Sequence, residues 1–158
     1  MVGEERGERG ERGERKMAGR FMGSDEELRD ILSRYKVVAV VGLSNKPQRD
    51  GFLVGKYLLK HGYKVIPVNP MYQEVLGEKA YPDLVSLPYT PEIVDCFRKK
   101  EAMFDVVEDA IRSKAKVVWA QFGAGNLEAL QRAVEAGLDV VVERCIMREY
   151  KRLFGERV

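Results

Sequence analysis

The strongest candidate for chemistry is a polar loop that begins at Gly42 and ends at Gly51. Gly42 follows a run of β-branched residues and permits a tight turn, and helical spacing resumes just after Gly51, so backbone N–H groups there should lack partners. Unpaired donors at the start of a helix attract an anion, and a diphosphate is a common one. Lys46 and Arg49 add positive charge, and Ser44 adds a hydroxyl. The loop therefore predicts phosphate binding, with an ordinary solvated βα connection as the alternative.

This loop does not match the two commonest nucleotide-binding patterns. It lacks the G-x-G-x-x-G of nicotinamide dinucleotide folds, and the second predicted strand ends in Val68, Asn69 and Pro70 rather than in an acidic residue that could hold a ribose hydroxyl. The loop also lacks G-x-x-x-x-G-K-[ST]. NAD is therefore disfavoured, and a P-loop that hydrolyses ATP is excluded.

Other reactive side chains are few. His61 is the single histidine and lies at a predicted helix C-terminus, where an imidazolium would favourably face the helix dipole. Cys96 and Cys145 are far apart and form no C-x-x-C pair, so zinc sites and nucleophile–histidine sites are disfavoured. We expect Asp50 to be a helix N-cap. Glu143 is more simply a solvated or ion-paired carboxylate than a general base.

Alternating strands and helices must position these residues. Short β-branched runs predict strands buried on both faces, at 36–41, 64–68, 93–97, 116–120 and 139–142. Helical spacing predicts helices at 52–60, 102–113, 126–136 and 146–154, after a first one that begins with a capping box at Ser24. The segment 71–91 is rich in proline and predicts a loop with one short strand. This rhythm predicts an α/β doubly wound parallel sheet of about five strands in the order 3-2-1-4-5, with helices on both faces.

The domain organisation is simple. Residues 1–23 are mostly Glu-Arg-Gly repeats with almost no apolar side chains, which predicts a disordered tail. Residues 24–158 are expected to form one domain. In an open parallel sheet the ligand binds beyond the carboxyl ends of the strands. The corresponding segments are 42–51, 69–70, 98–99, 121–126 and 143–145.

Several spaced motifs, in order, resemble the small stand-alone CoA-binding proteins, which are similar to the nucleotide-binding N-terminal domain of the succinyl-CoA synthetase α subunit. The resemblance runs from about Ser24 to Phe154. The motifs that carry it are Val41-Gly42-Leu43-Ser44, Pro47-x-Arg49, Gly62-Tyr63-x-Val65-x-Pro67-Val68-Asn69-Pro70, Val94-Asp95-x-Phe97-Arg98, Val118-Trp119-x-Gln121-x-Gly123 and Arg144-Cys145-Ile146.

The resemblance implies a three-layer Rossmann-like domain that binds coenzyme A. By it, the first loop lies on the diphosphate, Asn69 and Pro70 flank the adenosine, and Phe97 and Arg98 line the same crevice. Family members often carry Ser at the position of Gly51, so one hydroxyl contact is expected to be missing here. The cofactor-binding residues implied together are Gly42, Leu43, Ser44, Lys46, Arg49, Gly51, Val54, Asn69, Pro70, Phe97, Arg98, Gln121 and Gly123.

The resemblance also bears on catalysis. Synthetase-like enzymes use a phosphorylated histidine on a further domain, which this sequence does not continue into, so we expect binding of CoA or acyl-CoA without catalysis. Cys145 would lie near the pantetheine thiol and exchange with CoA disulfides, or it is a small buried residue of the core. Cys96 is expected in the core, and Trp119 in the core or as a pocket wall.

Composition narrows the remaining classes. A formal net charge of +2 gives no field for a nucleic-acid backbone, and no apolar stretch approaches the roughly 20 residues that span a bilayer. A cytoplasmic protein is expected. Three functions stay open at this point. They are a CoA carrier, sensor or regulator, an NAD(P)-dependent oxidoreductase, and a partner subunit that lends a CoA site to an acyl-CoA ligase. Homo-oligomerisation is equally open.

Overall fold

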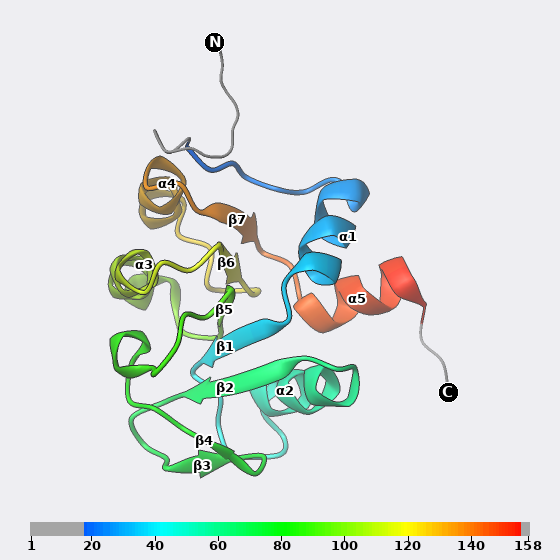
Figure 1. The fold of residues 1–158 in the computed structure, drawn as a ribbon, viewed down its shortest axis with the longest axis vertical. Helices are drawn as coiled ribbons and strands as arrows, with labels where there is room; N and C mark the ends of the chain where they lie inside the picture. The colour runs from blue at the N-terminus through cyan, green and yellow to red at the C-terminus, as the bar shows by residue number, and fades with distance from the viewer. Residues whose placement is uncertain (1–17, 156–158) are drawn as a thin grey trace.

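Five parallel strands form the central sheet of residues 18–155, the part of the chain that the computed structural model describes (Figure 1). Each strand is a short run of mainly β-branched residues, buried on both faces as the sequence pattern predicts. The α/β class is confirmed. The strands are β1 (Val37–Val41), β2 (Lys64–Val68), β5 (Ile93–Cys96), β6 (Val117–Ala120) and β7 (Asp139–Val142).

The order of the strands differs from the expected 3-2-1-4-5 in one respect. The sheet runs β2-β1-β5-β6-β7, so β5, third of these five strands along the chain, lies beside β1 and not beyond β2. The place beyond β2 is taken by the proline-rich segment, which forms a parallel bridge from Tyr81 to Val68. Chain order therefore reverses between β1 and β5, and this is the switch point at which open α/β sheets bind ligands.

The proline-rich segment contains a hairpin where a loop with one strand was predicted. Its strands are β3 (Glu74–Val75) and β4 (Glu78–Lys79), which pair antiparallel. Leu76 and Gly77 connect them, both with positive φ, as a two-residue hairpin turn requires. A 3₁₀ turn, η1 (Leu84–Ser86), follows.

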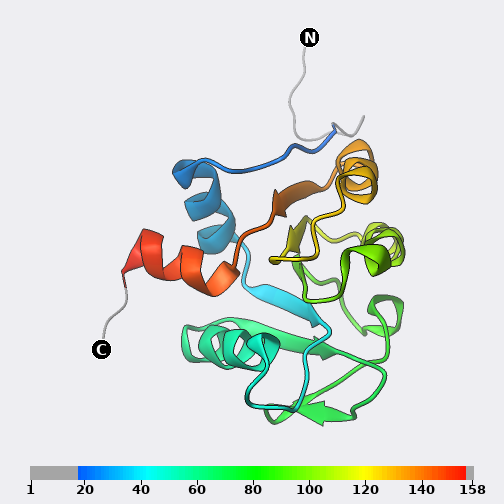
Figure 2. The same cartoon turned by 180° about the vertical axis from the view of Figure 1, so that it is seen from behind.

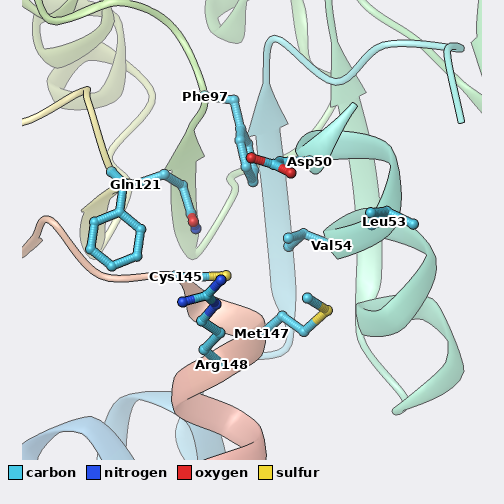
Figure 3. Close-up of a pocket in the computed structure, with 9 residues that line it drawn as sticks. Asp50, Leu53, Val54, Phe97, Gln121, Cys145, Met147 and Arg148 are labelled. Carbon is cyan, nitrogen blue, oxygen red and sulfur yellow. The ribbon is translucent and has the colours of Figure 1, made fainter. Parts of the chain in front are cut away.

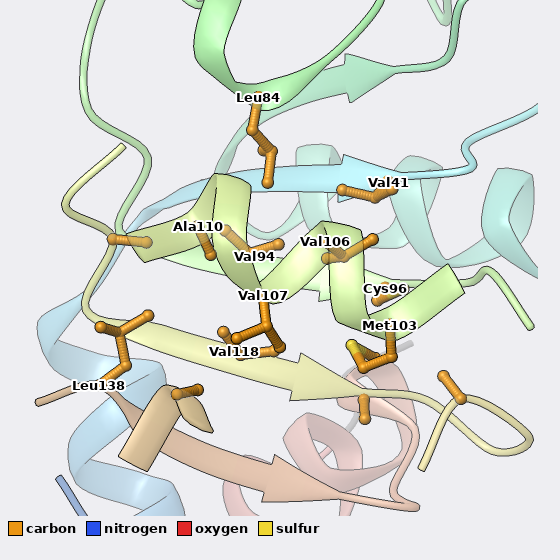
Figure 4. Close-up of a cluster of buried hydrophobic side chains, with 14 of the residues drawn as sticks. Val41, Leu84, Val94, Cys96, Met103, Val106, Val107, Ala110, Val118 and Leu138 are labelled. Carbon is orange, nitrogen blue, oxygen red and sulfur yellow. The ribbon is translucent and has the colours of Figure 1, made fainter. Parts of the chain in front are cut away.

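Helices cover both faces of the sheet (Figure 2). Helices α1 (Asp25–Arg34), α2 (Asp50–Lys60) and α5 (Ile146–Phe154) pack on one face over a core that includes Leu28, Leu58 and Ile146. The other face is covered by the 3₁₀ turn η2 (Lys100–Ala102) with α3 (Met103–Arg112) and α4 (Leu127–Glu135). Figure 4 shows this second core, in which α3 lies across β1, β5 and β6.

The start of the described chain lies along the outer strand β7. The backbone of Arg20 and Met22 exchanges hydrogen bonds with Val140, at 2.9 and 2.7 Å, and Phe21 forms a parallel bridge to the same residue. The packed domain thus includes residues 19–22, ahead of the boundary expected at Ser24. Most of the predicted tail, residues 1–17, lies outside the described residues. Between residues 18 and 155, the helices are too short or too polar to cross a bilayer.

Candidate functional site

A pocket of about 120 Å³ opens at the carboxyl ends of the strands, between the first turns of α2 and α5 (Figure 3). Phe97 and Gln121 enter it from the ends of β5 and β6, and their side chains lie opposite Val54 of α2. Three of the predicted site residues, Val54, Phe97 and Gln121, thus line one pocket. The complete lining is Asp50, Leu53, Val54, Phe97, Gln121, Phe122, Cys145, Met147 and Arg148.

The two helices that border this pocket begin without a side-chain cap. The N-cap of α2 is Arg49 and that of α5 is Cys145, and neither side chain accepts a hydrogen bond from the helix. The prediction that Asp50 is the N-cap is wrong, because Asp50 already has helical backbone. By contrast, Ser24 caps α1 in the predicted capping box, and Asn126 caps α4. In α2 the Phe52 N–H already donates to the Arg49 carbonyl at 3.1 Å, so the N–H groups of Asp50 and Gly51 are the ones left open to a ligand.

The turn after β1 depends on Gly42. Its φ is +91°, and its N–H donates to the carbonyl of Val68 at 2.8 Å. A Cβ at this position would lie 3.2 Å from Cδ of Arg98, so the Arg98 side chain crosses directly over the glycine. The backbone of the loop and a guanidinium stem are thus held together at the switch point between β1 and β5.

Two polar side chains of the predicted site shape the loop itself. Ser44 Oγ accepts from the N–H of Lys46 at 3.0 Å and lies 3.4 Å from the Tyr72 hydroxyl. Asn69 donates from Nδ2 to the Leu43 carbonyl at 3.2 Å and accepts from the N–H of Met71. The Leu43 side chain is fully buried. Asn69 and Leu43 therefore position the loop, and the hydroxyl of Ser44 stays near its surface.

Three cations surround this turn and are not neutralised. Lys46, Arg49 and Arg98 are exposed, and none is in an ion pair with a residue of the described range. Gly51 begins the uncapped helix beside them, and a Cβ there would make only ordinary contact, 3.6 Å from Cγ of Phe97. The turn therefore offers positive charge and open N–H donors to an anion.

A second hollow of about 120 Å³ lies at the end of β2, toward the α3 side of the sheet. Pro70 and Arg98, both implied by the resemblance, line it together with Pro82 and Leu84. The carboxylates of Asp83, Asp105 and Asp109 also reach it, so a phosphate is disfavoured inside. The two hollows have no lining residue in common.

A buried polar pair forms part of the first pocket. Asp95 of β5 is fully buried, and its Oδ1 accepts from Nε2 of Gln121 at 2.5 Å. Within residues 18–155, Asp95 Oδ2 is the buried side-chain oxygen that has no hydrogen-bond partner. Burial raises the pKa of Asp95 from 3.8 to about 7, and the hydrogen bond from Gln121 opposes this rise only in part.

Gly123 is not brought into the pocket. Its N–H and that of Gly125 donate to the Glu143 carboxylate, at 3.2 and 2.8 Å. Glu143 itself has a positive φ of 55°, and a Cβ on Gly125 would lie only 2.5 Å from its Oε2. Glu143 is exposed, in agreement with the expected solvated carboxylate, and is in no ion pair with residues 18–155; its carboxylate also links the two N–H groups of the loop after β6.

The remaining reactive side chains lie in the core, at the far end of α2 or in the pocket. Burial raises the pKa of the Cys96 thiol to about 11, and Cys96 and Trp119 are fully buried core residues. His61 ends α2, stacks on the Tyr57 ring at 3.9 Å between centroids and lies at the opposite end of α2 from the pocket. Cys145 is mostly buried yet lines the pocket, so both of its interpretations remain. Within the described range, His, Cys, Asp and Glu form no cluster suited to a metal ion.

The sequence that forms this site matches a known protein family. Residues 36–151 match the CoA-binding domain family. The chain belongs to this family. The match runs from the start of β1 into α5 and so includes the turn at Gly42, both hollows and the buried pair.

Similar proteins include small and large ones. This chain is 42% identical to the uncharacterized protein YneT of Bacillus subtilis, over 78% of this chain and 91% of that protein. A solved structure of a hypothetical protein from Pyrococcus horikoshii is 53% identical, covers 84% of this chain and 93% of its own, and superposes with a TM-score of 0.82. An ADP-forming acetate–CoA ligase of Archaeoglobus fulgidus is 30% identical over 69% of this chain, which spans only 16% of the ligase.

Part of the pocket was missed in the sequence. Leu53, Phe122, Met147 and Arg148 were not among the predicted site residues, because the sequence placed Leu53, Met147 and Arg148 only on helices and Phe122 only within the segment 121–126. Asp95 did give a signal in the sequence, because a carboxylate in the middle of a strand buried on both faces is unusual.

Proposed function

We propose that this protein binds coenzyme A or an acyl-CoA without transforming it, as a carrier, sensor or regulator. The observation that carries the proposal is the turn at Gly42. It joins an uncapped helix start to three cations that form no ion pair within residues 18–155, at the switch point of a CoA-binding domain. Lys46, Arg49 and the first N–H groups of α2 would bind the diphosphate.

The two hollows suit the two ends of such a ligand. The hollow beside Pro70 and Arg98 would take the adenine, whose amine tolerates nearby carboxylates. The pocket beside Phe97 and Cys145 would take the pantetheine arm. The other residues implied at the site, Leu43 and Asn69, support the loop through their hydrogen bond. A non-catalytic role is supported by the engagement of Glu143 with loop amides.

Titration calorimetry with CoA, acetyl-CoA, NAD and ATP tests the proposal. We expect CoA to bind more tightly than NAD, and Arg49→Ala to weaken CoA binding about tenfold through loss of a charge-assisted contact. Arg34→Ala is the matched control, because Arg34 pairs with Asp30 on α1, on a different helix from the turn. Equal or tighter binding of NAD would refute the proposal in favour of a nicotinamide-dependent oxidoreductase.

A second function is favoured by the match to an acetate–CoA ligase. A subunit that lends its CoA site to such an enzyme needs apolar surface beside the pocket, and Leu53 and Phe122 are 49% and 62% exposed there. Affinity-tagged protein recovered from its native cells should then carry ATP-dependent acyl-CoA ligase activity. Tagged protein that binds CoA but carries no such activity argues for the stand-alone role.

A further inference from the structure

Asp95 and Gln121 are the polar side chains that are buried in the described part of the chain, and stability does not explain them. Asp95 lies in the middle of the sheet, opposite Val40 on one side and Trp119 on the other. An apolar residue would pack there at lower cost than a carboxyl group whose Oδ2 has no partner among residues 18–155. A buried polar pair that does not serve the fold is a candidate for ligand recognition.

The hydrogen bond between the two side chains fixes which end of the Gln121 amide faces Asp95. Nε2 of Gln121 donates to Asp95 Oδ1, so the carbonyl Oε1 is directed away from Asp95. Gln121 lines the pocket, and its side chain lies between Phe97 and Cys145 (Figure 3). No residue of the described range donates a hydrogen bond to Oε1. The Gln121 carbonyl is therefore an acceptor of fixed orientation in the pocket.

We propose that Asp95 is a positioning residue that holds Gln121 so that its Oε1 accepts a hydrogen bond from an amide N–H of the pantetheine arm of coenzyme A. This inference rests on the proposed function, and it adds the part of the ligand that the first pocket selects.

The rest of the pocket fits that arm. Leu53, Val54, Phe97, Phe122 and Met147 supply apolar surface around the Gln121 amide, and Asp50, Cys145 and Arg148 complete the lining. The arm has the same make-up, since short alkyl segments alternate with two amide groups and a thiol. A volume of about 120 Å³ is below the roughly 300–1,000 Å³ of pockets that enclose a whole drug-sized ligand, so it suits the end of a thin chain. A ligand without an N–H at this point would leave Oε1 desolvated and unpaired, which supplies selectivity.

The test compares CoA with adenosine 3′,5′-bisphosphate, which lacks the arm, by titration calorimetry of the full chain. We expect Gln121→Met to weaken CoA binding about three- to tenfold, the loss of one neutral hydrogen bond, and to leave bisphosphate binding unchanged. Asp95→Asn retains an acceptor for Nε2 and should keep most of the CoA affinity, whereas Asp95→Leu should lose it to the same degree as Gln121→Met. Gln131→Met, on the exposed face of α4, is the matched control.

A double variant, Asp95→Leu with Gln121→Met, guards against misfolding, because replacing both partners by apolar groups of similar shape removes the unsatisfied carboxyl group. It should fold and show the same selective loss of CoA affinity. Equal effects on CoA and bisphosphate, or no effect on either, would overturn the inference and leave the proposed function standing. If the wild-type protein binds neither CoA nor the bisphosphate, the proposed function is overturned as well.

Discussion

The buried carboxyl group of Asp95 should make stability fall as pH rises from acid to neutral. Its pKa is about 7 in the folded protein because of burial, against 3.8 for the exposed group. Between these values the folded state holds the proton and the unfolded state has released it, so each rise in pH favours unfolding. The whole difference corresponds to on the order of 4 kcal/mol. About two thirds of it, roughly 3 kcal/mol, should develop between pH 5 and pH 8.

Asp95→Asn removes this dependence, since an amide of the same shape still accepts from Gln121 and does not ionise. Guanidinium denaturation of both proteins at several pH values from 5 to 8 measures the free energy of unfolding. We expect the wild-type protein to lose roughly 3 kcal/mol relative to Asp95→Asn across this range. The test depends on how the free energy of unfolding changes with pH, so any difference between the two proteins at pH 5 does not affect it. Two pH profiles that run parallel would show that Asp95 does not change ionisation there and would refute the reasoning.

Three further predictions concern single residues. Gly42→Ala should lower the free energy of unfolding by about 1–3 kcal/mol in urea denaturation, because of the φ of +91° and the approach to Arg98; unchanged stability would contradict this. Gly51→Ser should fold normally and unfold at an equal or slightly higher temperature, since its Cβ has room and serine suits a first helical turn better than glycine does; a marked loss would show that the space is not there. CoA disulfide should form one mixed disulfide with Cys145 and release one CoA thiol. Intact mass should show the CoA adduct on the wild-type protein and on Cys96→Ser but not on Cys145→Ser. An adduct that persists in Cys145→Ser would exclude this residue.

The elements of the fold could be read from the sequence because each strand is a short apolar run between turn residues. The helix that begins after Ser24 was predictable from its reciprocal cap, which the structure confirms. The order of the strands was not predictable in the same way. It depends on where the segment between β2 and β5 lies, and the two-residue strands of its hairpin are too short to leave a periodic signal.

The candidate site was predictable where it depends on backbone. Gly42 and the start of α2 follow from residue types alone, because few residues other than glycine tolerate such a φ. The side chains of the pocket depend on packing between distant elements. Gln121 and Asp95 are 26 positions apart, and only the register of β5 against β6 brings them into contact. The family resemblance named both residues in its motifs without indicating that they bond to each other.

The two outer strands of the sheet are each covered by a short stretch of neighbouring chain. Beside β2 lies the bridge from Tyr81, and Pro67 within β2 has no N–H to offer. Beside β7 the backbone of Arg20 and Met22 occupies both hydrogen-bonding groups of Val140. Because the edge strands are covered, they offer few unpaired backbone N–H and C=O groups to a second copy of the protein. This disfavours aggregation by edge-to-edge strand pairing. Shortening the chain past Met22 would therefore be expected to cost solubility before it costs ligand affinity.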